Sequence, residues 1–232
     1  MRNKVITFDA FNTLFRLKDS VANIYIQQLR LHCGPSQAPT PAAVALSFQS
    51  AFKRNDRLHP LFGRDLKGGY PTWWQTVVNQ TFEDAGVDKR DLNQKDISQH
   101  IFNHFSTAAP FEVNPAARPL LAELKGRQFV VGIVSNSDER TLKVLDEFGL
   151  TSFIDFAVLS SSAGFEKPNP HMFQIALDRA SELAGVQIYT HNALHIGDDL
   201  TRDFEAAKAC GWNARLLTKD WEALQNLVQE AI

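Results

Sequence analysis

Polar side chains stand at the ends of apolar runs in four separate parts of the chain. Asp9 follows the run "VITF", and Ser135 closes the run "VVGIVS". Lys167 lies in "GFEKPNP", and Asp198 opens an acidic segment, "DDLTRD", that ends at Asp203. Carboxylates can attack an electrophile or bind a hard cation, and lysine or hydroxyl groups can stabilise an anion. The four segments therefore supply groups for chemistry on an anionic substrate.

Each of these polar residues also has an ordinary structural explanation. Asp9 and Asp198 could cap the segments that follow them, Ser135 and Asn136 could form local turns, and Lys167 could be a solvated loop charge. In open α/β sheets, however, ligands bind beyond the carboxyl ends of the strands, where strand ends that are distant in sequence meet. The joint occurrence of the four segments in this order favours a functional site.

Composition narrows the classes of partner. The chain has 232 residues, is 44% hydrophobic and carries a net charge of −2 with interspersed signs, so it lacks the basic footprint of a nucleic-acid binder. Cys33 and Cys210 have neither metal-ligand spacing nor the density of a disulfide scaffold. Neither a secretory leader nor a membrane span is indicated. The expectation is a cytoplasmic or nuclear protein with a small-molecule partner and no indicated protein partner.

Hydrophobic periodicity divides the chain into two styles. Between residues 20 and 107 apolar residues recur three and four apart without a strand signal. The helices predicted there cover residues 21–33, 41–55, 71–86 and 91–105. From Asn114 onward, helices alternate with short apolar runs. Those runs, at 129–136, 156–161, 193–199 and 214–217, are typical of buried parallel strands.

The pattern predicts an α/β fold. A Rossmann-like parallel sheet with helices on both faces would form from residues 1–15 and 110–232. Residues 16–109 would form an all-helical cap domain inserted after the first strand. The connecting stretches, 15–18 and 106–114, are the expected hinges.

The motifs resemble those of the haloacid dehalogenase superfamily of hydrolases, in the form that carries a helical cap after the first strand. The segments "TFDAFNTL", "GIVSN", "GFEKPNP" and "HIGDDLTRD" are similar to its four motifs, and the last is the most specific. The match extends over essentially the whole chain. Within the superfamily the chain most resembles the small eukaryotic branch of haloacid dehalogenase-like hydrolase domain-containing proteins.

Chemistry and resemblance together assign expected roles in a metal-dependent phosphatase. Asp9 is the expected nucleophile, which would form an aspartyl phosphate. Asp9 and Asp198 are the expected direct ligands of Mg²⁺. By resemblance, the backbone oxygen of Phe11 completes the metal site, and Thr13 positions the nucleophile loop.

The remaining site residues are expected to support the transferring group. Ser135, with backbone amides around Asn136, would hold that group, and Lys167 would offset its charge. Asp199 and Asp203 are expected to orient ligands or water from behind the metal, although either could bind it directly.

Phe11 is the main departure from the family pattern. Phosphatases of the family carry a second aspartate there, which protonates the leaving oxygen, and a phenyl ring cannot do so. Three explanations follow: a phosphatase that is weak or acts on leaving groups needing little protonation, a 2-haloacid dehalogenase, or a catalytically impaired binding or regulatory protein. The paired acids of "GDD" argue against dehalogenation, because collecting them without a cation is costly. Phosphatase activity on small phosphorylated metabolites is the leading hypothesis.

Overall fold

The computed structural model describes residues 4–34, 38–218 and 221–229, and the chain divides into two compact units. The α/β unit takes in the described residues up to Arg16 and from Phe111 onward. The helical unit runs from Leu17 to Pro110. The sequence had placed both boundaries one residue earlier.

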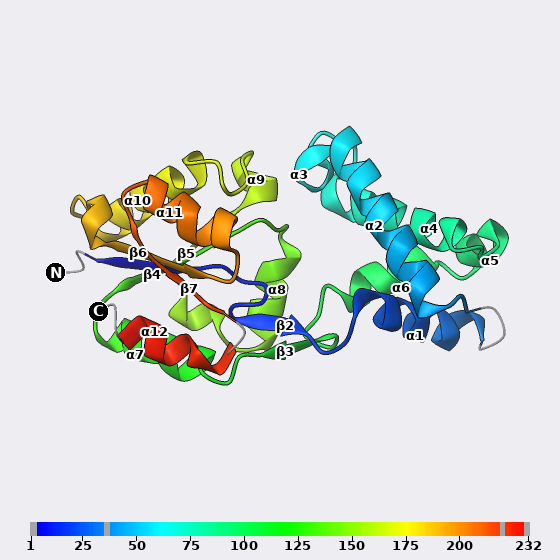
Figure 1. Ribbon diagram of the computed structural model, residues 1–232, viewed down its shortest axis with the longest axis horizontal. Helices are drawn as coiled ribbons and strands as arrows, with labels where there is room; N and C mark the ends of the chain where they lie inside the picture. The colour runs from blue at the N-terminus through cyan, green and yellow to red at the C-terminus, as the bar shows by residue number, and fades with distance from the viewer. Residues whose placement is uncertain (1–3, 35–37, 219–220, 230–232) are drawn as a thin grey trace. The chain divides into compact units, whose positions relative to one another are not determined.

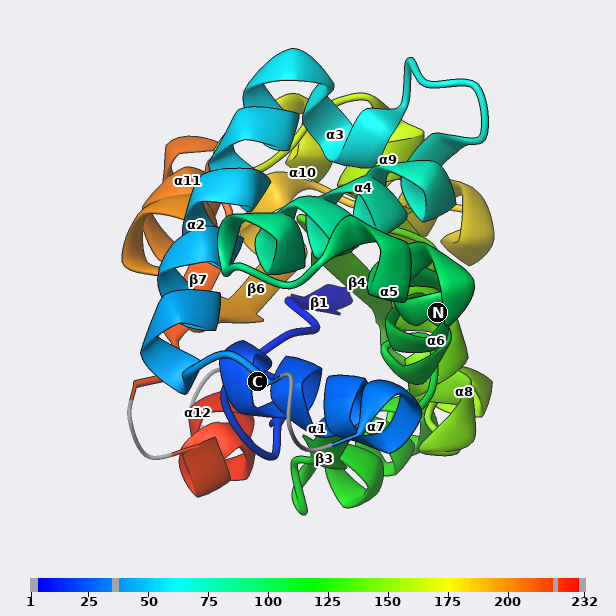
Figure 2. The ribbon, with the colours of Figure 1, turned by 90° about the vertical axis from the view of Figure 1, so that its right-hand side faces the viewer.

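The α/β unit is built on a five-stranded sheet whose strands all run parallel. The strands in spatial order are β5 (Phe156–Leu159), β4 (Val130–Ser135), β1 (Val5–Phe8), β6 (Ala193–Gly197) and β7 (Asn213–Leu216). Figure 2 shows β1 between β4 and β6. All four residues of β1 are buried, because a central parallel strand is covered on both faces.

Helices cover both faces of this sheet, as the sequence predicted. The helices of the unit are α7 (Ala117–Gly126), α8 (Arg140–Glu147), α9 (Ser160–Ala163), α10 (His171–Ala184), α11 (Ala206–Ala209) and α12 (Leu224–Gln229). Figure 1 shows α10 and α11 on one side of the sheet and α7 and α12 on the other. Val5, Val134 and Phe173 belong to the buried core cluster between the sheet and α10. The α/β class of the fold is therefore confirmed.

Two short strands occupy the stretches that the sequence indicated as hinges. β2 (Phe15–Leu17) and β3 (Phe111–Val113) form a separate two-stranded sheet where the chain leaves and re-enters the α/β unit. Arg16 Nε donates to Glu112 across this pair at 2.6 Å. Three-residue strands are too short to show a period, which is why sequence patterns did not predict them.

After Leu17, where β2 ends, the labelled elements of the helical unit are all helices, and Figure 1 labels each of them. They are α1 (Val21–Cys33), α2 (Pro41–Leu58), α3 (Pro60–Gly63), α4 (Gly69–Asp84), α5 (Lys89–Gln94) and α6 (Ile97–His104). Ser20 and Thr40 cap α1 and α2 by accepting backbone N–H groups. Among the residues described, no helix is long and apolar enough to span a bilayer.

The prediction of one helix over residues 91–105 is wrong. Asp96 adopts a left-handed conformation, with φ of 47°, and this separates α5 from α6. The apolar period continues across the break because Leu92, Ile97 and Ile101 all enter the same core. A period alone cannot reveal such a break, since the buried face is preserved.

Candidate active site

The register of the sheet brings its polar strand ends together. Phe8 pairs with Ile133 of β4 and with Ile196 of β6. The Asp9 N–H continues the ladder by donating to Ile196 O at 2.8 Å. Asp9 therefore emerges at the carboxyl edge between the ends of both neighbouring strands.

A pocket of about 140 Å³ opens at this edge. Every residue that the sequence predicted for the site lines this pocket, except Thr13. Asn12 and Arg202 also line it and were not predicted. The lining residues are Asp9, Phe11, Asn12, Ser135, Asn136, Lys167, Asp198, Asp199, Arg202 and Asp203.

The Lys167 ammonium group is buried and uses all three of its protons. Nζ donates to Asp9 Oδ1 at 2.7 Å, to Val134 O at 2.8 Å and to Asp203 Oδ1 at 2.5 Å. Burial alone would lower the pKa of Lys167, but the charges of Asp9 and Asp203 outweigh burial and raise it. The lysine is therefore a fixed positive charge beside Asp9.

Asp203 is held by donors on both carboxylate oxygens. Oδ1 accepts from Lys167 and from His195 Nε2 at 3.1 Å, and Oδ2 accepts from the Asp199 N–H at 3.0 Å. Burial would raise the pKa of Asp203, but the His195 hydrogen bond and the Lys167 charge hold it well below its usual range. Asp203 is thus an anion that positions Lys167.

His195 extends this network into the core of the sheet. Its side chain is fully buried, and Nδ1 lies 2.8 Å from Thr7 Oγ1. Burial lowers the pKa of His195, so the ring is neutral. The neutral tautomer that satisfies both neighbours carries its proton on Nε2, donates it to Asp203, and accepts from Thr7. His195 is thus linked to Lys167 through Asp203.

Gly197 is required by the close approach of Asp203. A Cβ atom built on Gly197 would overlap the carboxylate of Asp203. The glycine of "HIGDD" is therefore a packing requirement of the acid that follows it six residues later.

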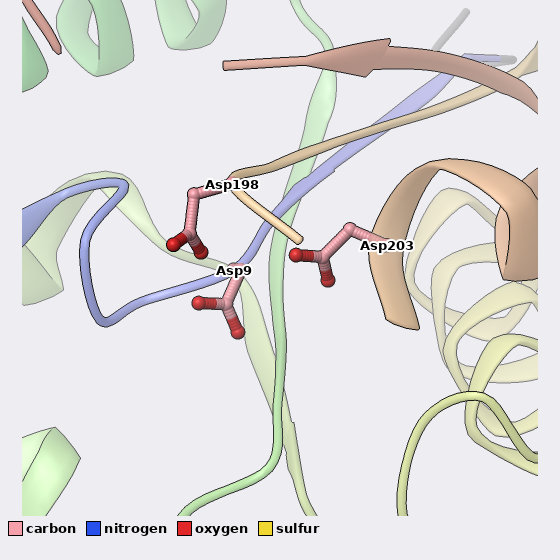
Figure 3. A group of neighbouring side chains, drawn as sticks. All are labelled: Asp9, Asp198 and Asp203. Carbon is pink, nitrogen blue, oxygen red and sulfur yellow. The ribbon is translucent and has the colours of Figure 1, made fainter. Parts of the chain in front are cut away.

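Three carboxylates converge in the pocket (Figure 3). Asp9, Asp198 and Asp203 each offer an oxygen, and these atoms lie within 4.8 Å of one another. Burial raises the pKa of Asp9 above its usual value, and the charge of Asp203 adds to the rise although Lys167 opposes it. Burial also raises the pKa of Asp198. One lysine against three acids leaves an excess of negative charge, which a cation would relieve.

The oxygen donors that remain fit a hard cation. Lys167 binds only Oδ1 of Asp9, and Asn12 Nδ2 donates only to Oδ2 of Asp198 at 3.2 Å. Within the described residues, no hydrogen bond ends on Asp9 Oδ2 or on the Phe11 carbonyl oxygen, and the Asp198 carboxylate accepts only from Asn12 and from its own backbone N–H. Carboxylate and carbonyl oxygens are the ligands that Mg²⁺ prefers. These three groups would hold the ion.

The turn after Asp9 depends on Asn12. Its backbone is left-handed, with φ of 60°, a conformation that asparagine tolerates better than most residues. The same residue holds Asp198 through its side chain. The sequence did not indicate this contact, because the partner lies 186 residues away.

Thr13 anchors this turn through its backbone. Its carbonyl oxygen accepts from Asn114 Nδ2 at 3.2 Å and from Trp221 Nε1 at 3.1 Å. The Thr13 hydroxyl is buried and finds no hydrogen-bond partner among the described residues. The structure therefore places Thr13 behind the pocket wall rather than in it.

Ser135 and Asn136 lie side by side but do different things. Ser135 is buried at the end of β4 and lines the pocket. The Asn136 amide instead clamps the Lys167 backbone, since Nδ2 donates to Lys167 O at 2.8 Å and Oδ1 accepts from Lys167 N at 2.6 Å. The side chain of Asn136 thus fixes the loop that carries Lys167.

Asp199 is tied to Arg202 at the rim. Arg202 Nη2 donates to Asp199 Oδ2 at 2.7 Å, while Oδ1 accepts the N–H groups of Thr201 and Arg202. Hydrogen bonds from Arg202 lower the pKa of Asp199. The carboxylate caps the helical turn Leu200–Glu205, and Arg202 adds a positive charge to the pocket that the sequence did not single out.

Phe11 presents an apolar surface to the pocket. Its side chain is 40% exposed, and the ring packs edge-on against Phe15 and Phe111 with centroids 6.2 and 6.5 Å away. Aromatic pairs at such distances are favourable and hold the ring in place. Phe11 is therefore the one aromatic residue among the described residues that line the pocket.

Comparison with known proteins gives the class of the chain. A model of the haloacid dehalogenase-like hydrolase family matches residues 3–211. The chain belongs to this family of hydrolases.

Individual relatives agree with this assignment. The haloacid dehalogenase-like hydrolase domain-containing protein 3 of Xenopus laevis is 30% identical over 217 residues, which are 94% of this chain and 85% of the relative. The HAD-hydrolase YfnB of Bacillus subtilis, described as bound to magnesium, has a TM-score of 0.63 at 20% identity and covers 94% of this chain and 89% of its own. A 2-haloacid dehalogenase of Pseudomonas syringae has a TM-score of 0.64 at 20% identity, with 99% of both chains covered. At this identity the two solved structures support the fold alone.

Proposed function

We propose that this hydrolase is a Mg²⁺-dependent phosphatase that acts on small phosphorylated metabolites through an aspartyl-phosphate intermediate. One observation carries the proposal. Buried Lys167 fixes Oδ1 of Asp9. Three groups stay open to a hard cation, namely Oδ2 of Asp9, the Asp198 carboxylate and the carbonyl oxygen of Phe11. This arrangement suits an acidic nucleophile that must approach a dianionic phosphoryl group.

The chain's own residues divide the work of the reaction. Bound Mg²⁺ would neutralise phosphoryl oxygens and so let the carboxylate approach them. Lys167 holds the Asp9 carboxylate in place and puts a positive charge beside it. Ser135 and the backbone near Asn136 would hold the phosphoryl oxygens, and Asp203 keeps Lys167 oriented.

The acidic cluster favours this reaction over halide displacement. A haloacid offers one negative charge and a leaving group that needs no metal, so three convergent carboxylates would only repel it. A purely regulatory role would not require Asp9 to be both fixed by a lysine and open to a cation. Mg²⁺ binding and turnover together distinguish these alternatives.

The test is a screen of phosphorylated metabolites with and without Mg²⁺, using the wild type, Asp9→Asn and Asp84→Asn. We expect wild-type turnover to need Mg²⁺ and Asp9→Asn to lose at least about 10³-fold in kcat, because the nucleophile is removed. Asp84 lies on the surface of the helical unit, so its variant should keep wild-type rates. Turnover that survives in Asp9→Asn would contradict the mechanism. So would a wild type that shows neither turnover nor Mg²⁺ binding by calorimetry.

A further inference from the structure

We infer that the substrates are phosphates whose leaving group departs as a stable anion, namely acyl and aryl phosphates, because no side chain among the described residues that line the pocket is free to protonate a departing oxygen. This inference rests on the proposed phosphatase function. It adds the class of substrate, which the family assignment does not supply.

The acids of the pocket are all engaged. Among the described lining residues, Asp9 is the nucleophile and Asp198 belongs to the cation site. Asp203 accepts three hydrogen bonds, and Asp199 accepts four from Thr201 and Arg202. In both side chains each carboxylate oxygen is therefore already occupied by donors from the protein.

The cationic side chains of the pocket are also poorly suited to protonate a departing oxygen. Lys167 spends its three protons on three oxygens of the protein, two of them from carboxylates. Arg202 is bound to Asp199, and a guanidinium does not deprotonate in proteins. Ser135 and Asn12 can hydrogen-bond an oxygen but do not give up a proton at neutral pH.

Phe11 lines the pocket and brings no proton donor to it. The ring lines the pocket two residues after the nucleophile, and its contacts with Phe15 and Phe111 keep it there. Its exposed surface suits an aryl or acyl group better than a hydrated sugar or polyol. The ring therefore cannot protonate the leaving oxygen, and it provides an apolar contact for the leaving group.

The reaction balances without a protein proton donor. Asp9 forms a bond to phosphorus, the bond between phosphorus and the leaving oxygen breaks, and its electron pair departs with a carboxylate or phenolate. Water then attacks phosphorus, the bond to Asp9 breaks, and both water protons leave with dihydrogen phosphate. Carboxylic acids and phenols have pKa values of about 4 and about 10, so their anions can depart unprotonated, whereas an alkoxide is far more basic.

The test is the dependence of kcat/KM on the leaving group, measured in Mg²⁺ with acetyl phosphate, p-nitrophenyl phosphate, phenyl phosphate and glycerol 3-phosphate. The quantity kcat/KM reports the step that breaks the bond to the leaving group. We expect it to fall steeply along this series in the wild type. Phe11→Asp should raise the value for glycerol 3-phosphate by about 10²-fold or more, since general acid assistance is worth about 10²–10⁴-fold. The gain should be smallest for acetyl phosphate.

Phe11→Leu is the matched control, because leucine removes the ring without adding a proton donor. It should keep the steep wild-type order of substrates. A wild type that hydrolyses glycerol 3-phosphate as well as p-nitrophenyl phosphate would overturn the inference and leave the phosphatase proposal standing. No turnover of any substrate by any variant would overturn both. The wild-type series needs no substitution, so it decides the question even if a variant fails to fold.

Discussion

The helical unit and the pocket of the α/β unit pair cations with acids in opposite ways. In the helical unit, Arg54 meets Asp84 at 2.9 Å, and both side chains are more than 40% exposed. In the pocket, the side chains of Lys167 and Asp203 are each 2% exposed. Surface pairs contribute about 0–1 kcal/mol, whereas removing one partner of a buried pair costs about 3–5 kcal/mol.

The two pairs differ in what it costs to bury their charges. A folded protein gains little net stability from a buried ion pair, because desolvation offsets the attraction. The core of the helical unit accordingly consists of apolar and aromatic residues such as Tyr25, Phe82 and Trp73. The buried charges of the pocket are therefore better explained by binding of a ligand than by stabilisation of the fold.

The largest expected effect comes from removing the buried cation. Lys167→Met should lower the free energy of unfolding by about 3–5 kcal/mol, because Asp9 and Asp203 would remain buried without their partner. Arg54→Met makes the same chemical change at the surface and should cost less than about 1 kcal/mol. Urea denaturation of both variants measures the contrast. Equal losses would show that the two kinds of pair do not differ.

A smaller effect is expected from crowding Asp203. Gly197→Ala should destabilise by about 1–3 kcal/mol, because the new methyl group would overlap the Asp203 carboxylate. Gly126→Ala is the control, since a Cβ there meets open space at the end of α7. That variant should stay within about 1 kcal/mol of the wild type. Thermal unfolding distinguishes the two, and an unperturbed Gly197→Ala would contradict the packing argument.

The pH dependence should be the most gradual effect. The pKa of Asp203 is lowered in the folded protein, so its contribution to stability is present above the unfolded pKa of about 3.9 and is lost as the pH falls further. The stability gap between the wild type and Asp203→Asn should therefore be full at neutral pH and narrow below about pH 4. Denaturation at several pH values measures this gap. A gap that widens on acidification would mean that the folded pKa is raised instead.

Much of the fold could be predicted because it depends on local patterns. The apolar runs over 129–136 and 193–199 became β4 and β6, and the cap residues Ser20 and Thr40 begin α1 and α2 where expected. The break at Asp96 and the short strands β2 and β3 were missed, because neither changes the period of the buried residues. The pattern of apolar residues indicates which face of a helix or strand is buried and how long that element is. It does not indicate the backbone conformation of a single residue.

The candidate site was predictable in its members and less so in their contacts. The sequence singled out Asp9, Lys167 and Asp198, and the structure places them in one pocket. It did not indicate that Asn136 clamps the Lys167 backbone, nor that His195 joins the same network through Asp203. Such contacts join residues 31 and 8 positions apart across loops, where no period applies.

The sequence by itself determined which chemical groups are present and that they stand at the ends of strands. Phe11 by its type already excludes a proton donor two residues after Asp9, because a side chain's chemistry does not depend on the fold. The folded structure shows which carboxylate oxygens remain available to a cation and which charged side chains are already paired with one another. Hydrogen bonds and burial depend on distances of a few ångströms between distant segments, and the register of the parallel sheet sets those distances.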